Sequence, residues 1–344
     1  MVACDQWSTT AGRPRGPPAP QAAQREPAAA GGVADLTQAR YDLNSIQEIT
    51  SSRDAGGQYA DKSDGTTEGE AMSVDLQPEP VRTGPEFVQY EVVDRVATIW
   101  LNRPEVKNCV NWALLQQFGE TLEQAERDPD VRVVLIRGRG HTFCAGADLK
   151  MLDTEFLGTT NNSVEIAQVS ARIWGRAFNL AKPTVAVVEG YAVAGGFELM
   201  ISCDFAVVAD DAKIGDYHIR RALFGGAGPI YRLPRYIGLR RTKELLLTGK
   251  LLSGRRCADW GLANVSAPAA ELDDAVAEFI APMKDKSAFT MRITKLAANR
   301  GLDGDTETLI ALESMTCNVA HQSNDAREGV QAFLQKRDPV WTDS

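Results

Sequence analysis

Apolar and polar side chains follow two different periods along the chain from residue 87 onward. Residues 87–93 (FVQYEVV) and 96–102 (VATIWLN) alternate as strands do, with two polar residues between them, and this pattern predicts a β-hairpin. Residues 111–128 and 164–181 instead place apolar side chains at helical spacing and predict two amphipathic helices. The apolar positions are Leu115, Phe118, Leu122 and Ala125 in the first helix and Ile166, Val169, Ile173, Ala177 and Leu180 in the second.

Short, continuous apolar runs predict buried strands between these helices. VRVVLIRG, PTVAVVEG and DFAVVAD have this character, and GGFELMISC, between the last two, predicts a short helix. Strands that alternate with helices are typical of an α/β domain. After Pro234 the pattern is mostly helical. We therefore expect an α/β core over residues 85–275 and a helical region over residues 276–344.

Residues 1–84 show no sustained period and are rich in proline, glycine and small polar residues. Such a segment buries too little apolar surface to offset its chain entropy, so we predict a disordered N-terminal extension, with a short helix over residues 35–49 as an alternative. The sequence from Met72 onward is typical of the start of a bacterial enzyme. The first 71 residues are therefore expected to be an added tail or a mis-assigned start, with a regulatory or docking arm as the open alternative.

Composition narrows the possible partners. The 344 residues are 44% apolar, which allows a sizeable core, and the net charge of −9 without a basic stripe argues against nucleic acid or an anionic membrane as partner. The six cysteines lie far apart, without the spacing of a zinc site or a disulfide framework. No apolar run approaches the ~20 residues of a membrane helix, and no signal pattern opens the chain. We predict a reduced, cytoplasmic protein with no metal and no membrane span.

Two turns rich in small residues carry the candidate chemistry. Residues 141–152 and 190–200 each lead from a predicted strand into a predicted helix. Small residues let a ligand approach the backbone closely, and the first amides of a helix have no partner within it. Two such amides that point at one carbonyl oxygen would form an oxyanion hole. Tight turns without a further role remain the alternative.

Several stretches resemble the enoyl-CoA hydratase/isomerase (crotonase) superfamily, in order from about Phe87 to Trp341. They are FCAGADLKML, KPTVAVVEGYAVAGGFELMISCDFAVVADDAKIGDYHI, GGAGPIYRLPRYIG, LLLTGKLLSGRRCADWGLAN and the closing DAREGVQAFLQKR. The resemblance implies a spiral of β-β-α turns with a helical C-terminal region that builds trimers, often paired into hexamers. It also implies an acyl-CoA substrate, whose CoA part positions the acyl group, and no metal or redox cofactor.

The resemblance also implies roles for individual residues. The amides of Ala145 and Gly195 match the two oxyanion donors. The positions that match CoA or substrate contacts are Lys107, Ala147, Asp148, Leu149, Gly226 and Lys336. For Lys107 and Lys336, an ordinary solvated lysine remains the alternative.

Glu198 resembles the first of the family's two catalytic glutamates, although a glutamate in the first turn of a helix also stabilises that helix. The second glutamate of hydratases follows Gly-x-Pro, whereas this chain reads Gly215-Asp216-Tyr217-His218. The pair therefore survives as a carboxylate and an imidazole, or only Glu198 remains.

Two neighbouring features stay open. Arg220 and Arg221 follow His218 and predict a solvated edge or, alternatively, a pocket for a polar acyl group. Asp204 is expected to be structural.

Three functions fit these residues. A hydratase-like lyase would use Glu198 to activate water and His218 to exchange the other proton. An isomerase of 3-enoyl-CoA would need Glu198 alone. A non-enzymatic acyl-CoA-binding protein is the third, and a retained Glu198 argues against it.

Overall fold

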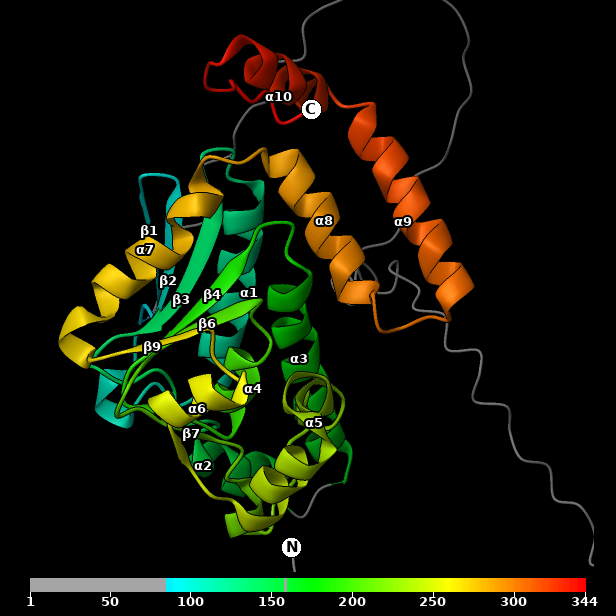
Figure 1. Cartoon of the computed structure of the whole chain (residues 1–344). Helices are drawn as coiled ribbons and strands as arrows, with labels where there is room; N and C mark the ends of the chain where they lie inside the picture. Colours follow the sequence, from blue (N-terminus) through cyan, green and yellow to red (C-terminus); the bar gives the residue numbers. More distant parts are fainter. Residues whose placement is uncertain (1–84, 158–159) are drawn as a thin grey trace, which may run out of the picture. The chain divides into compact units, whose positions relative to one another are not determined.

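The computed structural model describes residues 85–157 and 160–344 (Figure 1). The predicted disordered extension of residues 1–84, with its alternative helix and the expected start at Met72, lies outside the described residues. The described residues belong to one unit that ends at Ser344. The predicted division of this unit at residue 275 stays a prediction.

A six-stranded sheet in the order β1-β2-β3-β4-β6-β9 forms the centre of this unit. Its strands are β1 Val88–Val93, β2 Val96–Leu101, β3 Val133–Gly138, β4 Thr184–Val188, β6 Phe205–Ala209 and β9 Val265–Ala267. The predicted hairpin is confirmed: β1 and β2 are antiparallel, and Asp94 and Arg95 have the positive φ angles, 49° and 65°, that suit a two-residue turn. The remaining pairs are parallel.

Helices cover both faces of this sheet, so β4 is buried at every position. Figure 1 shows α7 (Leu272–Lys284) across one face and α1 (Trp112–Arg127) and α3 (Thr160–Asn179) on the other side. The side chain of Asn111 caps α1 by accepting the amide of Leu114 at 2.9 Å. The predicted apolar face of α1 is buried. In α3 the predicted face is buried at Ala177 and half-buried at Val169 and Ile173, and Trp174, which was not part of the predicted face, is buried as well.

A second, three-stranded sheet has the order β5-β7-β8. Its strands are β5 Tyr191–Val193, β7 Lys213–Gly215 and β8 Leu252–Ser253. The apolar pattern did not predict it, because strands of two or three residues are too short to show a period. This small sheet positions the site described below.

The predicted α/β class and the helical C-terminal part are confirmed. The other helices are η3 Pro104–Val106, α2 Leu149–Met151, η4 Leu152–Phe156, α4 Gly195–Met200, η5 His218–Arg221, α5 Pro229–Thr248, α6 Gly254–Trp260, η6 Ala269–Glu271, α8 Ala288–Arg300, α9 Thr306–His321 and α10 Asn324–Gln335. α9 has no buried residue, which distinguishes it from the helices that pack on the sheet.

Candidate active site

Three chain segments, the stretch at Cys144, β5 and β7, run parallel to one another and end at the same edge of the molecule. The amide of Cys144 donates to the carbonyl of Tyr191 at 2.8 Å, and the amide of Val193 donates back to Cys144 at 3.1 Å. β5 pairs in turn with β7, with Val193 opposite Gly215. Because the carboxyl ends of parallel strands meet at one edge, the residues that follow these segments come together. They include Ala147, Glu198 and His218, which line the same cavity.

Two backbone amides lie close together at this edge. The amide of Ala147 has no acceptor among the described residues, and a Cβ atom at position 195 would lie 3.6 Å from this nitrogen. Gly195 is the first residue of α4, where an amide has no partner within the helix. Ala147 and Gly195 both line the cavity.

The assignment of Ala145 as an oxyanion donor needs correction. Its amide donates to the carbonyl of Lys107 at 3.0 Å, and Ala145 does not line the cavity. Gly146, with φ of 94°, turns the chain after Ala145, so the free amide at the cavity is that of Ala147. The candidate pair of donors is therefore Ala147 and Gly195.

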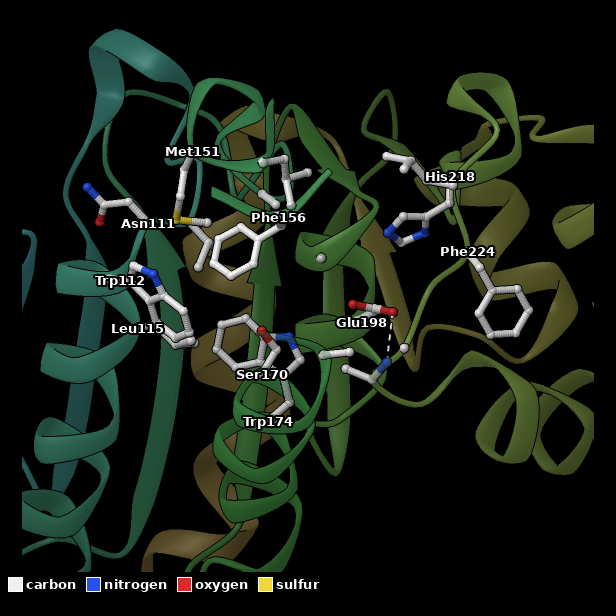
Figure 2. A pocket seen from close by; sticks show the side chains of 18 of the residues that line it. Asn111, Trp112, Leu115, Met151, Phe156, Ser170, Trp174, Glu198, His218 and Phe224 are labelled. Carbon is white, nitrogen blue, oxygen red and sulfur yellow. Dashed lines mark hydrogen bonds between the residues drawn. The ribbon is translucent and has the colours of Figure 1, made fainter. Parts of the chain in front are cut away.

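Glu198 lies at the cavity wall and is only 5% exposed. Its Oε1 atom accepts the amide of Ala227 at 3.0 Å, the bond drawn as a dashed line in Figure 2. Burial raises the pKa of the Glu198 carboxyl above its ordinary value, and the nearby His218 and the Ala227 amide reduce that rise. Once ionised, such a buried carboxylate is a stronger base than an exposed one.

His218 lines the same cavity, and Figure 2 shows its imidazole and the Glu198 carboxyl group on the same side of that cavity. The ring nitrogen Nδ1 lies 3.1 Å from Oδ2 of Asp216, which is also buried. Burial lowers the pKa of His218, but Asp216 and Glu198 outweigh it, so the pKa lies above its ordinary value. The predicted carboxylate–imidazole pair is thus brought together at one cavity.

The rest of the cavity wall is mostly apolar, with Asn111 and Ser170 as its polar side chains. Its volume is ≈ 220 Å³, and four aromatic side chains line it: Trp112, Phe156, Trp174 and Phe224. Figure 2 shows Trp112, Met151 and Phe156 across the cavity from Glu198 and His218. Sequence reasoning missed this wall because its residues come from α1, α3, η4 and the loop after η5, and no single motif contains them.

The predicted substrate-binding residues divide into two groups. Ala147 and Gly226 line the cavity, whereas Lys107, Asp148, Leu149 and Lys336 do not. Asp148 pairs with Arg103 at 3.1 Å and caps the short helix α2. The ammonium group of Lys107 lies 4.7 Å from the centre of the Tyr191 ring. CoA contacts for these four residues stay predictions.

The structure also bears on the hypotheses for Arg220, Arg221 and Asp204, which lie near the cavity residues in the sequence motifs. Arg220 donates to the carbonyl of Gly249 at 2.9 Å, and neither it nor Arg221 lines the cavity, which favours the solvated edge. Asp204 accepts the amide of Thr184 at 2.7 Å and pairs with Lys295 at 2.7 Å, as a structural residue would.

Searches over the described residues add two findings. No group of three or more His, Cys, Asp or Glu side chains among them is arranged to hold a metal ion. None of the described helices combines the length and apolar character that a membrane span requires.

The chain matches known proteins over most of its described length. The family model described as enoyl-CoA hydratase/isomerase matches residues 91–344. A probable enoyl-CoA hydratase of Mycobacterium bovis is 32% identical over 257 residues, which cover 75% of this chain and 98% of the relative. The human mitochondrial enoyl-CoA hydratase domain-containing protein 2 is 34% identical over 255 residues, 71% of this chain and 84% of the relative.

Among solved structures, the enoyl-CoA hydratase of Bacillus anthracis superimposes with a TM-score of 0.71 at 30% identity and covers 75% of this chain and 100% of its own. This similarity confirms the predicted crotonase-like fold. The chain therefore belongs to the enoyl-CoA hydratase/isomerase family.

Proposed function

We propose that this chain adds water across the double bond of a 2-enoyl-CoA thioester, with Glu198 and His218 as its acid–base pair. One observation carries the proposal. Glu198 and His218 line the same cavity as Ala147 and Gly195, whose amides lie close together. A hydration needs such a set, because a base, an acid and an enolate-stabilising group act on neighbouring atoms.

In the proposed reaction the amides of Ala147 and Gly195 hold the thioester oxygen. Ionised Glu198 takes a proton from water as the water oxygen bonds to C3 and the C2=C3 electron pair moves toward the thioester oxygen. Protonated His218 then gives its proton to C2, which completes the alcohol. The proton on Glu198 returns to His218 through solvent, so one water is added and nothing is oxidised.

The amides and the two side chains make separable contributions. Loss of one oxyanion donor costs about 2.7–4 kcal/mol of barrier in comparable sites. The pKa of Glu198, raised by burial, suits a base, and the raised pKa of His218 keeps more imidazolium near neutral pH. No metal or redox group enters these steps, and we propose that activity persists in the presence of a chelator.

Crotonyl-CoA tests the proposal directly. Mass spectrometry should show the addition of one water, with oxygen from labelled solvent in the product. Glu198→Gln keeps the shape of the side chain but removes the base, so turnover should fall by about 100-fold or more while acyl-CoA binding is nearly unchanged. Glu105→Gln changes an exposed glutamate outside the cavity and should leave turnover as it is.

The main competing reaction has a distinct product. An isomerase would convert 3-hexenoyl-CoA to the 2-enoyl isomer and leave crotonyl-CoA unhydrated. Since that reaction needs only Glu198, His218→Ala would barely affect it, whereas a hydratase should lose at least about tenfold. Isomerisation without hydration, insensitive to His218→Ala, would overturn the proposal. Binding of both thioesters without turnover would indicate a non-enzymatic acyl-CoA-binding protein.

A further inference from the structure

We infer that Asp216 is a positioning residue that holds the imidazole of His218 with Nδ1 toward the protein and Nε2 toward the cavity. The inference rests on the proposed function, because it concerns the acid that replaces the second glutamate. Asp216 does not line the cavity. It therefore acts on the substrate not by contact but through His218 and, by its charge, through Glu198.

The two carboxylate oxygens of Asp216 contact His218 at its backbone and at its ring. Its Oδ1 atom accepts the backbone amide of His218 at 3.3 Å, and its Oδ2 atom lies 3.1 Å from Nδ1 of the ring. Both Oδ2 and Nδ1 are buried, and neither atom has any other hydrogen-bond partner among the described residues. The angle at their contact is too bent for an ideal hydrogen bond, although the distance is suitable. Each is therefore the available partner of the other, and the neutral ring carries its proton on Nδ1.

The backbone at Tyr217 makes this arrangement possible. Tyr217 has φ of 61° and ψ of −11°, a left-handed conformation that is uncommon for a residue with a side chain. Proline, whose φ is fixed near −65°, cannot adopt it. The two departures from the Gly-x-Pro-Glu pattern thus fit together: a non-proline residue allows the turn, and the turn places Asp216 against His218.

Three ionisable side chains meet above Gly225. A Cβ atom at that position would lie 2.8 Å from Oε1 of Glu198, 2.9 Å from Oδ2 of Asp216 and 3.0 Å from Cε1 of His218. The glycine leaves this space open, so that the two carboxyl groups flank the imidazole.

Among the side chains that the structure describes, the other elements around His218 add no further charge to this group. The loop of residues 222–228 carries no ionisable side chain. Arg220 and Arg221 lie 5.3 and 5.9 Å from the Tyr217 ring and outside the cavity. Of the described side chains, those whose charges face His218 are Asp216 and Glu198.

The sign of the pH effect follows from these charges. Asp216 raises the pKa of His218, and its charge also raises the pKa of Glu198. Removal of the Asp216 charge therefore lowers both. Since the reaction needs imidazolium below the His218 pKa and carboxylate above the Glu198 pKa, both limbs of the pH–rate profile should move to lower pH.

The test combines NMR with kinetics on the full chain. The chain has three histidines, so nitrogen-15 spectra with His218→Gln identify the signals of His218. We expect the Nδ1–H tautomer in the neutral wild-type ring. In Asp216→Asn the pKa of His218 should fall, because the carboxylate charge beside the ring is lost. On crotonyl-CoA the same variant should lower kcat about tenfold with little change in KM, and Asp216→Glu should restore part of it.

Asp211→Asn is the matched control, because it removes the same charge from an exposed turn residue that does not line the cavity. It should change neither the His218 titration nor kcat. An Nε2–H tautomer in the wild type, or a His218 titration unchanged in Asp216→Asn, would overturn the inference. The NMR outcome does not depend on turnover, so an inactive enzyme with the expected tautomer would contradict the proposed function alone. If Asp216→Asn does not fold, the tautomer of His218 in the wild-type protein still tests the inference.

Discussion

Gly225 is the residue at which the site has no room for a side chain. The atoms that a methyl group would meet there are the ends of Glu198, Asp216 and His218, all nearer than 3.1 Å and none of them backbone. Side-chain ends can move by rotation, whereas backbone cannot without disturbing the fold. A methyl group at this position should therefore disturb the acid–base pair more than it disturbs folding.

We predict that Gly225→Ala lowers kcat on an enoyl-CoA by about 100-fold, the usual effect of a displacement of ~1 Å between reacting groups. Thermal unfolding should show a loss of no more than about 2 kcal/mol. Gly175→Ala, where a methyl group meets no atom within 4 Å, should leave kcat unchanged and, because alanine suits the interior of α3 better than glycine, should raise the stability by at most about 1 kcal/mol. Wild-type kcat in Gly225→Ala would mean that the three side chains do not act together.

Sequence reasoning at the residue scale placed Glu198 and His218 in one site, as the structure does, but misplaced one amide and overlooked Asp216. The string CAGAD offers several small residues in a row, and only the φ of 94° at Gly146 shows that the Ala147 amide, not that of Ala145, is free. Asp216 was overlooked because its contact with His218 depends on the left-handed backbone of Tyr217. Residue types in a motif do not reveal such backbone angles.

The elements that sequence predicts best are not the ones that place the site. The residues of β3, β4 and α1 form runs long enough to show their periods, and they were predicted. β5 and β7 have three residues each and were not. Yet their parallel register brings Glu198 and His218 together. Strand pairing is a long-range property, so a local pattern cannot give it.

α8 is attached to the core by a buried ion pair. Lys295 lies 2.7 Å from Asp204, with side chains 8% and 10% exposed, and also donates to the carbonyl of Lys182 at 2.9 Å. Burial lowers the pKa of Lys295 and raises that of Asp204, although each partner opposes the shift of the other. Loss of one partner leaves the other charge buried and unpaired.

Lys295→Met should therefore lower the free energy of unfolding by about 3 kcal/mol or more, measured by chemical denaturation. The double variant Lys295→Met/Asp204→Asn should lose less free energy of unfolding than the two single variants lose together, because the second change removes the charge that the first leaves unpaired. Lys243→Met, on the exposed side of α5, should stay within about 0.5 kcal/mol of wild type. Equal losses in the Lys295 and Lys243 variants would exclude the ion pair as an anchor.

The C-terminal helices leave apolar surface uncovered in the single chain. α9 has no buried residue, and its side chains Ile310, Met315 and Val319 are exposed, as is Phe333 on α10 at 83%. Monomeric proteins rarely expose such sets of apolar side chains on neighbouring helices. We propose that further copies of the chain cover them, as in the trimer or hexamer that the sequence resemblance implies.

We predict that sedimentation of the wild-type protein at micromolar concentration gives a trimer or a hexamer. Ile310→Glu together with Phe333→Glu should shift the species to monomer, because two charges would then be desolvated in each interface. Val93→Glu, at an apolar residue 73% exposed on β1 rather than on the C-terminal helices, should keep the wild-type assembly. A monomeric wild type would mean that α9 and α10 are covered in some other way, and assembly resistant to the double variant would place the subunit interface elsewhere on the molecule.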